Sequence, residues 1–99
     1  MTESAQRVAI VTGAAQGIGA AIARELAKHG HKVVVADLNE DGAKAVAAQI
    51  DGHAVRTDVS DPEQVKALRD EVLSKFGRVD ILVNNAAMVP CVPWESITF

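Results

Sequence analysis

The sequence predicts an α/β fold in which helices cover both faces of a parallel sheet. Four short apolar runs recur along the 99 residues, and a helix-length segment separates each run from the next. The first, second and fourth runs are rich in β-branched residues and nearly continuous, which is typical of strands buried on both faces of a parallel sheet. Because strand and helix alternate, the connections are expected to be right-handed crossovers that place the helices on the sheet faces.

The four expected strands coincide with these apolar runs. They are "RVAIVT" (Arg7–Thr12), "KVVVAD" (Lys32–Asp37), "HAVRTD" (His53–Asp58) and "DILVNN" (Asp80–Asn85). For such a doubly wound sheet we expect the strand order 3-2-1-4. The fourth run would then be an apolar strand at an exposed edge, an arrangement that natural proteins avoid.

The first helix is expected over residues 17–30, directly after the first strand. Ile18, Ile22 and Leu26 recur at helical spacing and form an apolar stripe with small alanines beside them. Gly30 provides a stop signal at the C-terminal end of this helix.

Two further helices are expected between the remaining strands. Asn39 is a suitable N-cap for a helix over residues 39–50. The clearest helical pattern spans residues 60–77, where Ser60 or Asp61 provides the N-cap and a proline follows in the first turn. The buried stripe of this last helix is expected to consist of Val65, Leu68, Val72 and Phe76.

Composition places the chain among ordinary globular proteins of one domain at most. Hydrophobic residues make up 48% and charged residues 23% of the sequence. A net charge of -3 without any cluster of Lys and Arg argues against a nucleic-acid partner. No apolar run approaches the roughly 20 residues of a membrane span, and the start "MTESAQR" is no signal peptide. With Cys91 as its single cysteine, the chain suits a reducing cytoplasm.

A glycine-rich stretch, "TGAAQGIG", joins the first strand to the first helix. A helix N-terminus presents free backbone N–H groups and the positive end of its dipole, which suits a diphosphate. Gly13 would permit the tight turn, Gly17 would let phosphates approach the backbone, and Gly19 would let the helix pack close to the sheet. The Gly-Lys-Ser/Thr of a P-loop is absent. The alternative is that the glycines merely make a turn.

Asp37 ends the second strand, close to the distance in sequence that is expected of a ribose-binding acid. Its carboxylate would accept hydrogen bonds from both ribose hydroxyls of an adenosine. The alternative is a solvated acid in a turn.

The spacing Thr-Gly-x-x-x-Gly-x-Gly, from Thr12 to Gly19, resembles that of the short-chain dehydrogenase/reductase family. Asp58-Val59 after the third strand and "NNA", from Asn84 to Ala86, after the fourth resemble two further motifs of that family. Ala87 departs from the glycine that is usual after "NNA". The resemblance covers the whole chain and implies the first βαβαβαβ half of a Rossmann-type sheet.

The resemblance implies a role for each matching position. The diphosphate side would be held by Gly13, Gln16, Gly17, Ile18 and Gly19. Asp37 would hold the adenosine ribose, Asp58 the amino group of adenine, and Val59 the adenine ring through its backbone. Asn84 and Ala86 would line the passage toward the nicotinamide. Thr12 and Asn85 are expected to be structural, Thr12 bracing the turn and Asn85 tying two strands.

Members of this family transfer hydride with the help of a serine and a Tyr-x-x-x-Lys pair, and this chain contains no tyrosine. No catalytic residue is therefore assigned, and residues 1–99 are expected to be the cofactor-binding part of a longer, homotetrameric enzyme. The resemblance implies an NAD(H)-dependent oxidoreductase acting on a small-molecule alcohol or carbonyl. The alternative is a dinucleotide-binding module without catalysis.

Other residues with reactive side chains fit no site. His29, His31 and His53 share no face of a predicted element, and a metal site is not expected. Cys91 and Trp94 lie in an apolar loop after the fourth strand, where Trp94 would line a substrate pocket or pack against a neighbouring helix or subunit.

Overall fold

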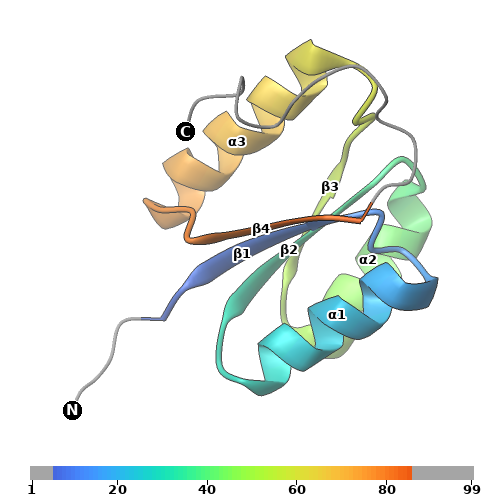
Figure 1. Cartoon of the computed structure of the whole chain (residues 1–99), viewed down its shortest axis with the longest axis vertical. Coiled ribbons are helices and arrows are strands. Elements are labelled where there is room, and N and C mark those ends of the chain that lie inside the picture. The colour runs from blue at the N-terminus through green and yellow to red at the C-terminus, as the bar shows by residue number, and fades with distance from the viewer. Residues whose placement is uncertain (1–5, 86–99) are drawn as a thin grey trace.

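The computed structural model describes residues 6–85, which form one parallel sheet flanked by helices (Figure 1). The strands are β1 (Val8–Thr12), β2 (Lys32–Asp37), β3 (His53–Arg56) and β4 (Ile81–Asn84). Their order in the sheet is β3-β2-β1-β4, and all three pairs are parallel. The expected order 3-2-1-4 is confirmed, and the third strand ends two residues earlier than its apolar run.

The helices alternate with the strands and are α1 (Gly17–Lys28), α2 (Glu40–Ile50) and α3 (Pro62–Phe76). Helices α1 and α2 cover one face of the sheet, while α3 lies on the other face (Figure 1). This arrangement confirms the Rossmann-type doubly wound class. Of the helices in residues 6–85, none has the length and apolar character needed to cross a membrane.

The two faces of the sheet have separate cores, because successive residues of a strand point in opposite directions. β1 is buried along its entire length. The core under α1 and α2 contains Val11, Ala14, Ala20, Ala23, Val33, Val35, Ala43, Val46 and Ala47. The core under α3 contains Val8, Ile10, Val34, Ala36, Leu68 and Val72, with Phe76 partly buried beside it. The apolar stripe expected for the last helix is therefore confirmed.

The apolar stripe expected for α1 is wrong at its first position. Ile18 is 73% exposed, and Ile22 and Leu26 are only partly buried against the core. The side chains of α1 that face the sheet are those of Ala20 and Ala23. Small side chains let the helix lie close to the sheet, and the larger ones are displaced to the flanks of the contact.

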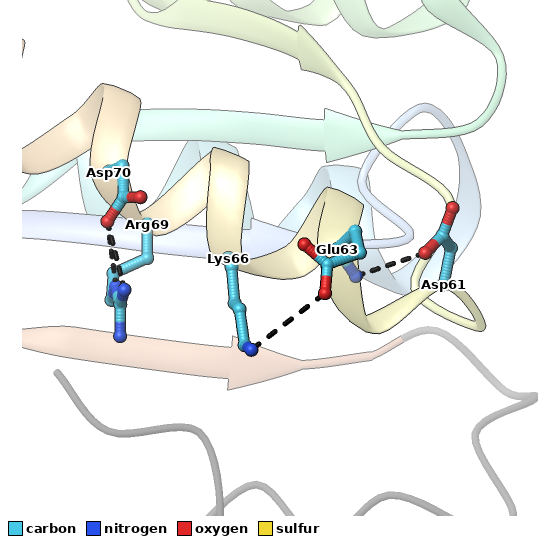
Figure 2. A network of polar contacts seen from close by, with 5 residues as sticks. All are labelled: Asp61, Glu63, Lys66, Arg69 and Asp70. Atoms are coloured by element: carbon cyan, nitrogen blue, oxygen red, sulfur yellow. Dashed lines mark hydrogen bonds and ion pairs between the residues drawn. The ribbon is translucent and has the colours of Figure 1, made fainter.

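Side chains cap the starts of α2 and α3. Asn39 accepts a hydrogen bond at its Oδ1 from the backbone N–H of Gly42 at 3.0 Å, which confirms it as the N-cap of α2. Asp61 rather than Ser60 is the N-cap of α3, since its Oδ1 accepts from the N–H of Glu63 at 3.0 Å (Figure 2). Both helices therefore begin with one of their free N–H groups satisfied by the chain itself.

Asp80 ties the start of β4 to the start of β1. Its Oδ2 accepts a hydrogen bond from the N–H of Val8 at 2.9 Å, and its own N–H donates to the Val8 carbonyl at 2.9 Å. Arg78 donates from Nε and Nη2 to the two oxygens of the same carboxylate, at 2.8 and 2.7 Å. The Arg78 hydrogen bonds, followed by the one from Val8, hold the pKa of the Asp80 carboxyl below its ordinary value.

We expect Asp80→Asn to lower the melting temperature near neutral pH by a few degrees, because it removes the paired carboxylate. A carboxyl whose pKa is lower in the folded state contributes stability above its unfolded pKa, and this contribution is lost as the pH falls through the folded pKa. The difference between wild type and Asp80→Asn should therefore shrink below about pH 4. Thermal melts from pH 3 to pH 8 measure this difference.

Asp70→Asn is the matched control for this experiment. Arg69 also donates two hydrogen bonds to Asp70, but Asp70 is exposed on α3 and contacts no strand through them (Figure 2). Because the Asp70 carboxylate is exposed, its ion pair is expected to contribute little to stability. An Asp70→Asn effect as large as that of Asp80→Asn would contradict the proposed link between the strands.

Candidate functional site

The expected site residues are distributed over the turns that follow the four parallel strands. These turns lie at one edge of the sheet, because parallel strands all end on the same side. The edge contains residues 13–16 after β1, residues 37–39 after β2, residues 57–61 after β3 and Asn84 at the end of β4. A backbone hydrogen bond of 3.0 Å from the Thr57 N–H to the Asp37 carbonyl joins two of these turns directly.

The glycine turn after β1 uses backbone conformations that other residues rarely adopt. Gly13 has φ +64° and Gly17 has φ +63°, both in the left-handed region. Gln16 between them is extended and occupies the N-cap position of α1. The expected role of Gly13 in a tight turn is confirmed. Among residues 6–85, and apart from the adjoining backbone, no heavy atom lies within 4 Å of where a Gly17 side chain would begin.

Gly19 brings the first turn of α1 against the backbone of the glycine turn. A Cβ on Gly19 would collide with the carbonyl oxygen of Gly13 and lie 2.6 Å from the Asn85 side-chain nitrogen. The expected close approach is therefore present, and its nearest partners are Gly13 of the turn and Asn85.

The N-terminus of α1 differs from those of α2 and α3. No side chain caps it, and its first turn carries no acidic residue. Within residues 6–85, the first backbone N–H of α1 with a protein acceptor is that of Ala20, which donates to the Gln16 carbonyl at 3.3 Å. The N–H groups of Gly17, Ile18 and Gly19 consequently remain open at the positive end of the helix dipole.

Asp37 is held in place by two backbone N–H groups. Its Oδ2 accepts from the N–H of Ala15 in the glycine turn at 3.0 Å, and its Oδ1 accepts from the N–H of Asn39 at 2.9 Å. Each carboxylate oxygen keeps a second lone pair for another donor. The carboxylate is half-buried and lies beside the exposed side chain of Leu38.

Asp58 is oriented in a similar way after β3. Its Oδ1 accepts from the Ser60 hydroxyl at 2.6 Å and from the Ser60 N–H at 3.0 Å. These hydrogen bonds, the one from the hydroxyl first, hold the pKa of the Asp58 carboxyl below its ordinary value. The N–H of Asp58 donates to the side chain of Gln64 at 2.9 Å. The position of Gln64 in the helical pattern gives no sequence signal of this contact, which depends on the path of the chain.

Thr12 and Asn85 connect the end of β4 to the end of β1. The Thr12 hydroxyl donates to the side-chain oxygen of Asn84 at 3.1 Å and accepts from the N–H of Asn85 at 3.1 Å. The Asn85 amide donates to the Gly13 carbonyl at 3.2 Å. The structural roles expected of Thr12 and Asn85 are confirmed. Ala86 lies outside the described residues, as do Ala87, Cys91 and Trp94.

A groove on the surface lies away from this edge. An open groove of about 530 Å³ is lined by Arg24, Ala27, Lys28, Ala48, Gln49, Ile50 and Asp51, at the C-terminal ends of α1 and α2. Its first lining residue on α1 is Arg24, about 10 Å along the helix from Gly17, so the groove does not adjoin the glycine turn. In the part of the chain that the structure describes, no three His, Cys, Asp or Glu side chains gather as metal ligands would.

Comparison with known proteins identifies the family. Residues 7–98 match the family model described as short chain dehydrogenase, and the chain belongs to that family. It is 45% identical over 97 residues to D-threitol dehydrogenase from Mycolicibacterium smegmatis, covering 93% of this chain and 37% of that protein. It is 50% identical over 88 residues to cis-4-hydroxycyclohexanecarboxylate dehydrogenase from Sinomonas cyclohexanicum, covering 85% of this chain and 35% of that protein.

A solved structure agrees with this assignment. The crystal structure of 3-ketoacyl-(acyl-carrier-protein) reductase from Brucella melitensis, complexed with NADH, superimposes with a TM-score of 0.74 and 45% sequence identity. The match covers 77% of this chain and 32% of that one. The chain thus spans little more than a third of the length of the curated relatives it matches.

We expect Gly19→Ala to destabilise the protein by about 2 kcal/mol or more, since the added methyl group overlaps the Gly13 carbonyl. Gly17→Ala is the matched comparison, because its methyl group would contact no neighbouring residue. Its only cost is the left-handed backbone conformation, which lowers the free energy of unfolding by about 1 kcal/mol. Urea unfolding of both variants measures the two free energies. Equal destabilisation by the two substitutions would contradict the close contact assigned to Gly19.

Proposed function

We propose that this chain forms the cofactor-binding part of an NAD(H)-dependent oxidoreductase that interconverts an alcohol and a carbonyl compound. The observation that carries the proposal is the uncapped N-terminus of α1, which follows a glycine turn at the end of a buried strand. A diphosphate supplies the acceptors and the negative charge that suit such a helix start. Asp37, hydrogen-bonded to the same turn, lies where an adenosine ribose would follow.

In the order of the strands across the sheet, the turns after β3, β2, β1 and β4 would meet the adenine, its ribose, the diphosphate and the nicotinamide of NAD. The open N–H groups of Gly17, Ile18 and Gly19, beside Gly13 and Gln16, would hold the diphosphate. The free lone pairs of Asp37 would accept the two ribose hydroxyls. Asp58 offers a carboxylate to the amino group of adenine, and the Val59 backbone would meet the ring.

The bound nicotinamide would supply the chemistry, accepting or donating a hydride. Asn84, and Ala86 by the resemblance, would line the approach to that ring. The residues of this chain bind and orient the cofactor, and none is assigned to proton transfer with the substrate. A small-molecule alcohol or carbonyl is the proposed substrate class, because the relatives named above are dehydrogenases of small alcohols and a ketoacyl reductase.

The proposed enzyme is a cytoplasmic homotetramer in its full-length form. Its activity is tested by following NADH absorbance while the full-length protein is offered polyols and cyclic secondary alcohols. Tight NAD binding without turnover of any alcohol or carbonyl would favour the second candidate, a dinucleotide-binding module without catalysis. The absence of tyrosine from these 99 residues is the observation that keeps this candidate open.

We expect the full-length protein to prefer NAD over NADP by roughly 10² to 10³ in affinity. The extra phosphate of NADP would face the Asp37 carboxylate, and like charges about 4 Å apart repel by about 1 kcal/mol in water and about 4 kcal/mol at an effective dielectric of 20. Loss of the ribose hydrogen bonds adds to this repulsion. Dissociation constants of both cofactors should converge in Asp37→Ala and stay separate in Asp41→Ala, an exposed acid on α2. Equal use of both cofactors by the wild type would overturn the assignment.

We expect Gly17→Ala to weaken NAD binding more than it weakens folding. Its methyl group meets no protein atom, so it would occupy the space through which phosphate oxygens reach the backbone. Calorimetric titration of the folded variant with NAD should show at least about a tenfold loss of affinity. Unchanged affinity would count against a diphosphate at this turn.

A further inference from the structure

Gln64, in the first turn of α3, holds the turn that connects β3 to α3. Its Oε1 accepts the N–H of Asp58 at 2.9 Å, and its Nε2 donates to Oδ2 of Asp61 at 3.3 Å. The N–H of Asp61 donates back to the Asp58 carbonyl at 3.0 Å. Three hydrogen bonds therefore join Asp58, Gln64 and Asp61 in a closed ring.

Asp61 anchors this ring to the helix. Its other carboxylate oxygen caps α3 by accepting the N–H of Glu63 at 3.0 Å (Figure 2), and its carbonyl accepts the N–H groups of Gln64 and Val65 at 3.0 and 3.1 Å. The side chain of Gln64 is half-buried, which restricts its rotamers. Asp58 is therefore held by the first turn of α3 as well as by the turn in which it lies.

The hydrogen bonds of Asp58 determine which of its polar atoms is left for a ligand. The Asp58 N–H donates to Gln64, its carbonyl accepts from Asp61, and its Oδ1 accepts from Ser60. Within residues 6–85, Oδ2 is the polar atom of Asp58 that has no protein partner. A carboxylate oxygen can only accept, so the group it recognises is a donor such as an amine.

We propose that Gln64 is a positioning residue for recognition of the nucleotide base: by fixing the backbone of Asp58, it aims the free carboxylate oxygen at the amino group of adenine. This inference rests on the function proposed above, and it adds a residue from α3 to a site otherwise built from the turns after the strands.

The test compares NAD with nicotinamide hypoxanthine dinucleotide, in which a carbonyl oxygen replaces the amino group of adenine. The full-length wild-type protein should bind NAD about tenfold more tightly, because the Asp58 carboxylate accepts a hydrogen bond from the amine and repels a carbonyl. In Gln64→Leu, which removes both hydrogen bonds, the preference should fall to about twofold or less, and NAD affinity should fall about tenfold. Isothermal titration calorimetry measures all four dissociation constants.

A matched control and a rescue separate base recognition from stability. Gln49→Leu makes the same change on α2, where the exposed amide only accepts a hydrogen bond from Arg24 at 2.9 Å, and should keep the wild-type preference. Gln64→Glu keeps an acceptor for the Asp58 N–H but sets a carboxylate against Asp61. It should restore most of the preference for NAD while lowering the melting temperature.

The outcomes distinguish this inference from the function on which it rests. A wild type that does not bind NAD overturns the proposed function. A wild type that binds both dinucleotides equally overturns the contact of Asp58 with the adenine amino group, and with it the role of Gln64, while the binding of NAD stands. A Gln64→Leu protein that keeps the full preference overturns the role of Gln64 alone. So does a Gln64→Glu protein that loses the preference as completely as Gln64→Leu. If Gln64→Leu does not fold, Gln64→Asn, whose shorter amide cannot reach the Asp58 N–H, replaces it with the same expected loss.

Discussion

The contact between Gly19 and the Gly13 carbonyl is the constraint on which the rest of the site depends. The chain leaves the buried strand β1 at Thr12 and must begin α1 at Gly17, so the first turn of the helix lies directly on the turn that precedes it. The contact leaves no room for a side chain at position 19. It also holds α1 close to the sheet, where Ala20 and Ala23 are fully buried.

The ends of the neighbouring strands hold this turn from both sides. Asn85, after β4, donates to the Gly13 carbonyl, and Asp37, at the end of β2, accepts from the Ala15 N–H. Asp37 therefore has two roles, since the carboxylate proposed to read the ribose also holds the turn proposed to bind the diphosphate. A substitution at Asp37 changes both parts of the site, which is why the selectivity between cofactors is a cleaner measure of its ribose contact than affinity alone.

The sequence allowed most of the fold and the arrangement of the site to be predicted, because these depend on local patterns. Continuous apolar runs identified the strands, and glycine spacing identified the turn. Helical spacing placed Ile18 on one apolar stripe with Ile22 and Leu26, but its exposure could not be predicted, because helical periodicity does not reveal how closely a helix approaches a sheet. Ser60 and Asp61 were equally good caps by composition, and only the path of the chain decides that Ser60 bonds to Asp58 while Asp61 caps α3. The contact of Gln64 with Asp58 has no sequence signal, because it depends on side-chain reach across a turn.

The N-termini of the three helices differ in whether the chain itself caps them. At α2 and α3, Asn39 and Asp61 each accept a hydrogen bond from a backbone N–H, and acidic residues in the first turn interact favourably with the positive end of the helix dipole. The N-terminus of α1 has neither a side-chain cap nor an acidic residue in its first turn, although Ser, Asp and Asn are common elsewhere in the chain. A cap at α1 would contribute about 1 kcal/mol of stability, but it would occupy the N–H groups to which an anion would bind. The open helix start is thus consistent with the diphosphate site proposed above. Of the groups that the family's cofactor carries, the diphosphate is the one with the matching charge and acceptors.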